Sequence, residues 1–455
     1  MNKENRSSFS GKLGFVLAAA GASVGLGNIW RFPYLAAQYG GGIFLLVYII
    51  LALTFGYTMI IAETAIGRMT KKSPVSAFGK FSDSRLVKAG GWINAIIPVL
   101  IVPYYSAIGG WVIKYLAEYL KGNVDDLATD SYFSDFITNG FEVELWFVVF
   151  AALVLAIVLL GVENGIERVS KIMMPLLLVL ALVIVIYVMT MPGALQGVKY
   201  FLIPDPRNFS WMTVVTAMGQ MFYSLSIAMG ILVTFGSYMK DDVSIENATE
   251  NVELFDTGIA VMAGLMIIPA VFAFSGGDSA AINGGPSLMF VTIPKVLSGI
   301  GFPRIGGIVF FILVLFAALT SAIALLESAV STLVDEANCS RTMAIILIGI
   351  STLVLGTLSS LGYGPLSWLQ ILKMPFLDFS DFLTNSVMMP IAALGICYVV
   401  TRHIGVDAIV AEVEKNGCPF KRKRVFSVMI RYLSPIFLVI ILLSSVANAF
   451  GIIKM

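Results

Sequence analysis

Charged residues are scarce in this 455-residue chain, where aspartate, glutamate, lysine and arginine together fill only 13% of the positions. Soluble domains carry about 25%. The two signs also nearly cancel, which leaves a net charge of +1. A chain without an extended basic surface is poorly suited to bind a phosphate backbone, so we expect no nucleic-acid partner.

Histidine and cysteine are almost absent. The only histidine is His403, and the three cysteines, Cys339, Cys397 and Cys418, lie far apart. Three scattered cysteines provide neither a disulfide framework nor the spacing of zinc ligands. The chain also lacks the H-E-x-x-H motif, and it has no usable histidine to serve as the base of a nucleophile. We therefore predict that the protein is not an enzyme.

The N-terminal stretch "MNKENRSSFSGKLGF" has no small-residue cleavage site after a short apolar core, so no removable signal peptide is expected. What the chain has in abundance is hydrophobic side chains, which make up 58% of it. The mean hydropathy is +0.91. These values predict a polytopic membrane protein, because apolar runs of about 20 residues are long enough to span a bilayer.

About eleven runs meet that length requirement. We expect transmembrane helices near 13–37, 42–67, 89–119, 143–161, 166–190, 211–238, 246–274, 306–334, 342–361, 379–400 and 428–451.

Basic residues are distributed unevenly over the connecting segments. About 20 of the 29 lysines and arginines fall on the side of the N-terminus, mostly in the loops 68–88 and 401–431. Since cytoplasmic loops are enriched in lysine and arginine, we predict a cytoplasmic N-terminus and, with an odd number of spans, a C-terminus outside.

Two of the predicted helices contain residues that interrupt helices. The first holds "GASVGLGNIWRFPY" at 21–34, and the sixth holds "GQMFYSLSIAMG" at 219–230. Irregular backbone inside a membrane is tolerated where it lines a cavity, and paired breaks in two halves of a chain are typical of inverted-repeat transporters. The alternative is that the small residues only let helices pack closely.

The motif "GxxVGLGNIWRFPY" followed by "GGGxF" at 40–44 resembles the first helix of the neurotransmitter:sodium symporter family. The resemblance covers nearly the whole chain, through "VPYYS", "MFYSLS" and "AALTSAIALLES" (317–328). In its number of helices, about eleven, the chain resembles the family's bacterial branch of multi-hydrophobic amino acid transporters. The resemblance implies an all-α integral membrane protein with the leucine transporter fold, a 5+5 inverted repeat in which helices 1 and 6 are unwound.

The implied organisation is a cytoplasmic N-terminal segment 1–12, a first repeat 13–190, a second repeat 211–400, a cytoplasmic loop 401–427 and a last helix with the C-terminus, 428–455. The implied function is a sodium-coupled symporter, in a bacterial plasma membrane, that imports hydrophobic or aromatic L-amino acids. Two alternatives remain, a non-transporting amino-acid sensor on the same fold and a symporter for another small amine or amino acid. A channel is disfavoured because the chain has two discrete breaks and no filter-like repeat.

The unwound segment near Leu26 and Gly27 would offer backbone N–H groups and a helix N-terminus to the substrate carboxylate. By family position the hydroxyl of Tyr105 joins them, although a tyrosine there is also compatible with an interfacial role. The implied substrate-binding set is Ser23, Leu26, Gly27, Ile101, Tyr105, Tyr223, Ser224, Ser226, Met229, Ser321 and Leu325. Met229 occupies a position where the leucine transporter has an aromatic residue, so a flexible apolar wall is expected.

Sodium is a hard cation that prefers oxygen ligands. The resemblance implies two sites, a first formed by Ser23, Asn28, Ser224 and Asp256 and a second formed by Gly21, Val24, Ala317, Thr320 and Ser321. Many family members have asparagine at the position of Asp256, with a separate negative charge nearby. We expect the carboxylate of Asp256 to supply that charge, so that chloride is not required. The alternative is an acid at the membrane interface near Glu250 and Glu253.

Gates are also implied. Arg31 would pair with Asp381, or with Asp378 in another register, on the outer side. On the inner side the family positions are Arg6, Phe9, Tyr238 and Asp335. In the fifth helix, Gly165 and Pro175 would let the segment between them unwind during inward opening, although a static kink at the proline explains the same residues.

Overall fold

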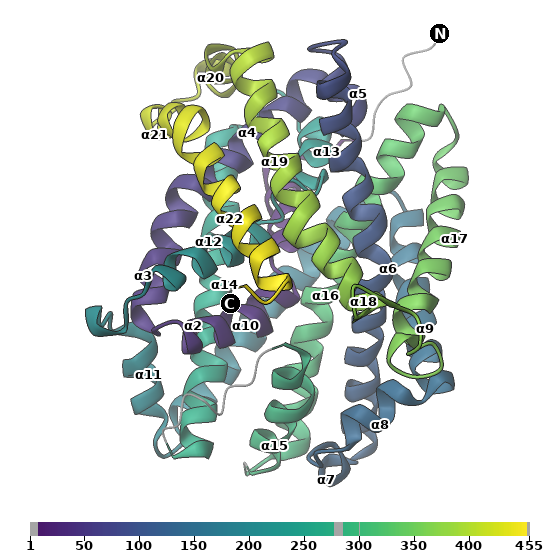
Figure 1. Cartoon of the computed structure of the whole chain (residues 1–455), viewed down its shortest axis with the longest axis vertical. Coiled ribbons are helices and arrows are strands. Elements are labelled where there is room, and N and C mark those ends of the chain that lie inside the picture. The colour runs from purple at the N-terminus through teal and green to yellow at the C-terminus, as the bar shows by residue number, and fades with distance from the viewer. Residues whose placement is uncertain (1–7, 277–284, 300, 453–455) are drawn as a thin grey trace.

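The computed structural model describes residues 8–276, 285–299 and 301–452, and these form a bundle of long helices (Figure 1). In chain order the α-helices are α1 Lys12–Ser23, α2 Phe32–Gln38, α3 Gly42–Leu51, α4 Tyr57–Thr70, α5 Pro74–Gly79, α6 Arg85–Lys121, α7 Val124–Leu127, α8 Tyr132–Thr138, α9 Gly140–Leu159, α10 Arg168–Met189, α11 Ala194–Leu202, α12 Trp211–Ser224, α13 Ile231–Tyr238, α14 Ile245–Ser275, α15 Ile293–Ser298, α16 Pro303–Ala337, α17 Arg341–Ser360, α18 Phe376–Asp381, α19 Met389–Val399, α20 Val406–Val413, α21 Lys423–Val428 and α22 Ser434–Ala449.

Several of these helices are continuous through wider π-helical turns. The turns span Gly27–Arg31, Ala52–Gly56, Val162–Glu167, Leu288–Thr292, Phe382–Met388, Val400–Ile404 and Met429–Leu433. A two-stranded antiparallel hairpin, β1 Gln370–Ile371 and β2 Met374–Pro375, precedes α18.

All eleven predicted apolar segments are helical. Within the described residues, nine continuous helices are long and apolar enough to cross a membrane, and α1 with Gly27–Gln38 adds a tenth span bent by 53°. The remaining predicted segment, 211–238, consists of α12 and α13, separated by residues 225–230. The segment 401–427, predicted as a loop, is partly helical because it contains α20 and the start of α21.

Local sequence explains where several of these helices begin and end. The hydroxyls of Ser210, Ser244 and Ser340 each accept a hydrogen bond from a backbone N–H of the first turn, which caps α12, α14 and α17. At the other end, Gly122 (φ 96°) and Asn338 (φ 48°) adopt the left-handed conformation that stops α6 and α16.

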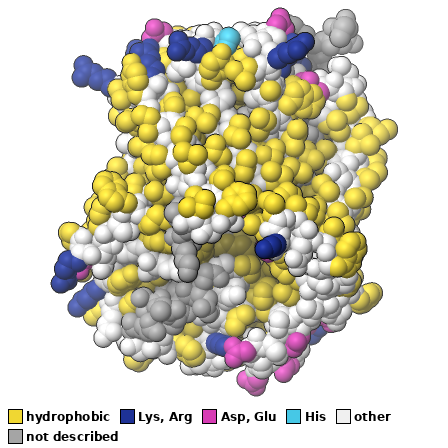
Figure 2. Space-filling model, in the orientation of Figure 1, with side chains coloured by type: hydrophobic (Ala, Val, Ile, Leu, Met, Phe, Trp, Pro, Cys, Tyr) yellow, Lys and Arg dark blue, Asp and Glu magenta, His cyan; other side chains and the backbone are white. Residues whose placement is uncertain are grey.

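The outside of the bundle is apolar between two polar ends. Figure 2 shows a broad band of hydrophobic side chains, with basic side chains gathered at the end that holds α20 and α21. The helices α7, α8, α11 and α15 lie at the opposite end. A band of this kind is the surface expected of a protein that faces lipid.

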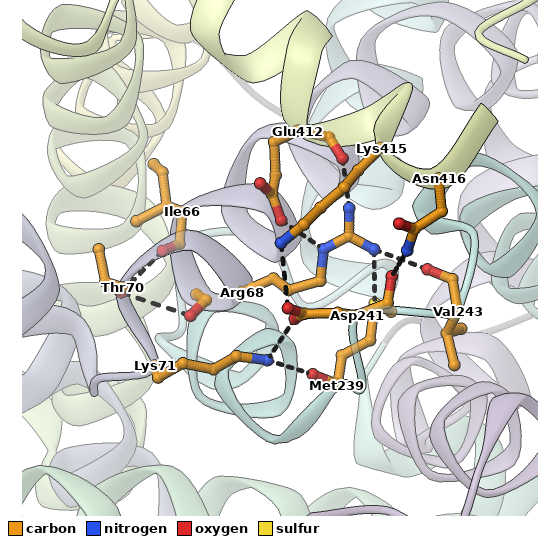
Figure 3. A network of polar contacts seen from close by, with 11 residues as sticks. Ile66, Arg68, Thr70, Lys71, Met239, Asp241, Val243, Glu412, Lys415 and Asn416 are labelled. Atoms are coloured by element: carbon orange, nitrogen blue, oxygen red, sulfur yellow. Dashed lines mark hydrogen bonds and ion pairs between the residues drawn. The ribbon is translucent and has the colours of Figure 1, made fainter. Parts of the chain in front are cut away.

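A network of polar contacts fastens α20 to the rest of the basic end (Figure 3). The buried guanidinium of Arg68, near the end of α4, donates to the carboxylate of Glu412 at 2.6 Å and to the carbonyl of Val243 at 2.6 Å. Beside it, Asp241 pairs with Lys71 and Lys415, each at 3.0 Å. These two ammonium groups lower the pKa of Asp241. The network therefore joins three segments that are far apart in the chain.

Candidate functional site

The two interrupted helices meet in the middle of the bundle. After α1 the backbone becomes extended at Val24 (φ −76°, ψ 97°). After α12 the chain turns through Ser226 (φ 53°) and Ala228 (φ 59°), a conformation that costs side-chain-bearing residues roughly 1–3 kcal/mol each. The hydroxyl of Ser226 donates to the carbonyl of Ala22 at 3.0 Å, so one break is bonded directly to the other.

A narrow pocket with a volume of about 20 Å³ lies between the breaks. All eleven residues of the predicted substrate-binding set line it, together with Ala22, Gly25 and Asn28. Helices α6 and α16 supply the side of the pocket that faces the two breaks, through residues such as Tyr105 and Leu325.

One end of the pocket is polar. The backbone N–H of Leu26 donates to the hydroxyl of Tyr105 at 3.2 Å. A Cβ at Gly25 would lie only 2.7 Å from the Ser321 hydroxyl and 3.0 Å from the Tyr105 hydroxyl, so this position has no room for a side chain. An anion placed here would accept hydrogen bonds from both the backbone and the tyrosine.

The other end of the pocket is apolar. Ile101, Met229 and Leu325 are all buried there. None of the described residues that line the pocket is charged. A charged side chain entering this end would lose its hydration without gaining a partner.

The residues of the first predicted sodium site are in contact with one another. The amide nitrogen of Asn28 donates to the Ser224 hydroxyl at 2.9 Å and to the Asp256 carboxylate at 2.8 Å. The Ser224 hydroxyl also donates to Asp256, at 2.9 Å. Asp256 is fully buried, and its carboxylate contacts Asn28 and Ser224, residues that lie beside the two helix breaks.

A cation fits this cluster with one adjustment. The carboxylate of Asp256 and the hydroxyl of Ser224 are oxygen ligands suited to a hard ion. The amide oxygen of Asn28 instead accepts from the N–H of Gly25 at 3.0 Å. Rotation of this amide would turn its oxygen toward Asp256 in place of its hydrogens.

Two residues of this region were missed by the sequence reasoning. The hydroxyl of Tyr48 donates to Asp256 at 3.1 Å, and the amide of Gln220 donates to the carbonyl of Gly27 at 2.9 Å. Tyr48 lies in a uniform apolar run and gives no sequence signal. Gln220 is a polar residue inside a membrane helix, and that signal was available.

The second predicted sodium site is a cluster of carbonyl oxygens around one hydroxyl. The Ser321 hydroxyl lies within hydrogen-bonding distance of the carbonyls of Gly21, Ala22 and Val24, at 3.2, 3.1 and 3.3 Å. A single hydroxyl hydrogen satisfies one of these three acceptors well, so the cluster has an excess of oxygen lone pairs. Such an excess favours a cation.

Thr320 and Ala317 complete this set from α16. The Thr320 hydroxyl donates to the carbonyls of Phe316 and Ala317, at 2.9 and 3.2 Å. A Cβ at Gly21 would lie 3.1 Å from the Thr320 Cβ. The predicted residues therefore lie side by side, with the threonine hydroxyl engaged by its own helix.

On the predicted outer side, the guanidinium carbon of Arg31 lies 5.2 Å from the centre of the Tyr223 ring, which lines the pocket. Arg31 and Asp381 attract each other but form no ion pair within 4.0 Å. Asp378 instead accepts a hydrogen bond from the Tyr363 hydroxyl at 2.8 Å. Of the two candidate acids, Asp381 is the one that interacts electrostatically with Arg31, and its carboxylate accepts a hydrogen bond from the amide of Asn385 at 2.6 Å.

On the predicted inner side, Phe9 is buried in edge-on contact with the rings of Phe15, Phe235 and Tyr238. Asp335 accepts from Lys72 at 3.1 Å and from the N–H of Ser73 at 2.7 Å. Arg6, the predicted partner of Asp335, lies outside the described residues.

The hydroxyl of Tyr238 donates to the buried carboxylate of Glu327 at 2.7 Å. Arg341 binds the same carboxylate through two hydrogen bonds, at 2.8 and 2.5 Å. Neither Glu327 nor Arg341 belongs to the predicted gate set. An acid inside an otherwise apolar helix is the sequence signal that would have found Glu327.

The fifth helix is wound in this structure. Gly165 lies in the π-helical turn Val162–Glu167, where a Cβ would collide with the carbonyl oxygen of Ile157. Pro175 lies inside α10, which continues without a break. Between them, the buried Glu167 pairs with Lys171 at 2.6 Å and accepts from the N–H of Ser10 at 2.8 Å.

A membrane-spanning bundle with a closed pocket between two broken helices defines the class of the protein, a carrier with a central site. The comparisons then identify the family. A model of the sodium:neurotransmitter symporter family matches residues 6–132 and 117–452. The chain belongs to this family, whose members are sodium-coupled symporters and not enzymes.

Related sequences and a related structure match this chain over most or all of its length. An uncharacterized sodium-dependent transporter of Bacillus subtilis is 32% identical, with 100% of both chains covered. One of Methanocaldococcus jannaschii is 34% identical over 87% of this chain and 81% of its own. The crystal structure of MhsT in complex with L-phenylalanine has a TM-score of 0.87 at 35% identity, covering 97% of this chain and 100% of that one. The predicted fold is thereby confirmed.

Proposed function

We propose that this protein is a sodium-coupled symporter that imports hydrophobic and aromatic L-amino acids by alternating access. The observation that carries the proposal is the pocket between the two helix breaks, polar at one end and apolar at the other. A zwitterion with an apolar side chain matches that polarity. Support also comes from MhsT, which was crystallised with L-phenylalanine.

In this proposal the substrate carboxylate lies between the N–H of Leu26 and the hydroxyl of Tyr105, groups that now bond to each other. The ammonium faces the carbonyls of Ser23, Tyr223 and Ser224 and the hydroxyl of Ser226. Two sodium ions occupy the Asn28–Ser224–Asp256 cluster with Ser23, and the carbonyl cluster of Gly21 and Val24 with Ala317, Thr320 and Ser321. The first ion couples to the substrate by sharing its carboxylate.

Chloride is dispensable in this proposal, because the carboxylate of Asp256 already supplies a negative charge beside the first sodium. The test is uptake into proteoliposomes with gluconate in place of chloride. Transport should continue in the parent protein, while Asp256→Asn should lose transport under the same chloride-free conditions. Loss of parent activity in gluconate, or full activity of the variant, contradicts the assignment.

The basic end with α20 and α21 faces the cytoplasm in this proposal, so that Phe9, Tyr238 and Asp335, with Arg6, form the inner gate. Arg31 and Asp381 form the outer gate, and Gly165 and Pro175 allow the fifth helix to unwind. Residues 13–190 and 211–400 are the two repeats.

The deciding experiment is uptake of a panel of radiolabelled amino acids into proteoliposomes, with and without an inward sodium gradient. Sodium-dependent, saturable uptake of leucine, phenylalanine and tryptophan, with counterflow of preloaded substrate, is the expected result. Sodium-dependent binding without any flux would identify an amino-acid sensor on the same fold. Uptake of another small amine, with no uptake of these amino acids, would overturn the substrate assignment.

A further inference from the structure

A second cavity, larger than the central pocket, opens on the outside of the bundle. Its walls come from α10, α14, α15 and α16, and its volume is about 290 Å³. Sixteen of the described residues line it, none of these is charged, and Tyr187 is the only one of them with a polar group in its side chain. We call this cavity the lateral groove. Its volume is close to the lower limit of the range of about 300–1,000 Å³ that is typical of ligand pockets.

The floor of the lateral groove is buried and its rim is open. Val188, Met266 and Val296 are each less than 5% exposed. At the rim, Val183 is 51% exposed and Ile305 is 61% exposed. The groove is thus a depression into the bundle and not a flat apolar face.

The groove is continuous with the surface that faces lipid. Its walls α10, α14 and α16 are all helices long and apolar enough to span a membrane. Along α10, the exposed side chains of Leu182 and Ile186 extend the apolar surface beside the groove. Within such a surface, hydrocarbon is the neighbouring medium, and a narrow apolar depression excludes water at little cost.

We propose that the lateral groove is a binding site for one acyl chain of a membrane phospholipid. The chain enters past Val183 and Ile305 and lies on the buried floor. Phospholipid is favoured as the source because none of the described residues of the groove is charged and could hold a carboxylate or an amine within it, while a headgroup remains outside.

This site would be connected to the proposed outer gate through one short element. The turn Leu288–Thr292 leads directly into α15, which forms one wall of the groove. In that turn, the ring of Phe290 contacts Trp30, at 6.3 Å between ring centres. Trp30 precedes Arg31, the residue proposed for the outer gate. A bound chain would therefore contact a segment that reaches the gate.

The test uses the full chain reconstituted in phosphatidylcholine bilayers that contain a small fraction of phosphatidylcholine with a diazirine in its acyl chain. After irradiation, peptides are quantified by mass spectrometry. We expect the groove peptides 266–270 and 293–310 to be labelled several-fold more, per exposed apolar residue, than the exposed face of α22 around Leu443. Excess unlabelled phosphatidylcholine should reduce the groove labelling in a saturable manner.

Two variants of α10 provide a matched pair. Val183→Trp places a large side chain at the rim and should remove most of the groove labelling. Ile186→Trp adds the same side chain one turn away, on the exposed surface outside the groove, and should leave it unchanged. Equal labelling of the groove and of α22, or undiminished labelling in Val183→Trp, would overturn the proposal. The readout is independent of transport, so it does not depend on the proposed function.

Discussion

At the residue scale, the central site depends on oxygen atoms that outnumber the hydrogens available to them. Three carbonyl groups of the first break surround the single hydroxyl of Ser321. The carboxylate of Asp256 is fully buried, and among the described residues it accepts hydrogen bonds only from Asn28, Ser224 and Tyr48, none of which is basic. Buried negative charge is costly unless it is compensated, and a sodium ion would compensate it.

Asn28→Ala and Thr320→Ala each remove one oxygen ligand from a proposed sodium site. A hydrogen bond or ligand contact to a charged partner is worth about 1.5–3 kcal/mol, so we expect the sodium concentration for half-maximal uptake to rise by roughly tenfold or more. Asn251→Ala is the control, because that side chain bonds only within its own helix. An unchanged sodium titration in both variants would show that the sites are misplaced.

Met229→Phe tests the apolar wall of the pocket. Methionine is unbranched and adapts to different shapes, whereas a phenylalanine ring is rigid. We expect the variant to lose affinity for tryptophan and tyrosine more than for leucine, by about 1–3 kcal/mol of discrimination. Competition against labelled leucine uptake measures this. Equal loss for all three substrates, or efficient uptake of glutamate or lysine by the parent, would contradict the wall assignment.

At the scale of elements, the decisive features are helix interruptions and the contacts that hold separate helices together. The breaks after Ser23 and Ser224 expose backbone groups that a continuous helix would consume. The wound fifth helix and the network around Arg68 instead hold elements in fixed positions. The helix breaks provide the groups that could bind ligands. The contacts between helices determine which movements of the helices cost little free energy.

Pro175→Ala should make the fifth helix harder to unwind, because alanine restores the backbone N–H that proline lacks. We expect slower hydrogen exchange in residues 165–174 and a several-fold lower rate of uptake, with little change in substrate affinity. Pro269→Ala, in the middle of α14, is the control for loss of a helix proline. If uptake by Pro175→Ala equals that of the parent, the proline is a static kink.

Arg68→Ala should strongly destabilise the basic end. The side chain of Arg68 is only 2% exposed and that of its partner Glu412 only 12%. Removing one partner of a buried pair typically costs about 3–5 kcal/mol. Lys415→Ala breaks a pair with Asp241 whose side chains are 40% and 53% exposed, so its effect should be about 0–1 kcal/mol. The apparent Tm in detergent measures both, and equal shifts would argue against this distinction.

At the scale of the whole molecule, the distribution of charge fixes the proposed orientation. Basic side chains gather at the end of α20 and α21 (Figure 2), and positive residues are retained on the cytoplasmic side. The native cysteines report on this end, since Cys339 and Cys418 are partly exposed and Cys397 is buried.

A membrane-impermeant maleimide should therefore label Cys339 and Cys418 in inside-out vesicles and not in right-side-out vesicles. Ser131→Cys, at the exposed start of α8 on the opposite end, should give the reverse pattern for its added thiol. Labelling of Cys418 from outside intact cells would reverse the proposed orientation.

The membrane class, the positions of the apolar helices and the two breaks were all predictable from the amino-acid sequence alone. These are local properties, because spanning length and helix-interrupting residues act within one segment. The fixed order of rare residues in "GLGNIWRFPY" was enough to identify the family, which the comparisons confirmed. The family resemblance also implied eleven substrate-binding residues, and all eleven line one pocket in the structure.

The contacts between side chains of distant helices could not be predicted in this way, because they depend on tertiary packing. Tyr48 reaches Asp256 across 208 residues of chain, and Arg68 reaches Glu412 across 344. No pattern within either segment encodes such a pairing, because it depends on how helices cross and which faces they bury. The lateral groove is likewise a product of packing, since its four walls are ordinary apolar helices that leave space only where they meet.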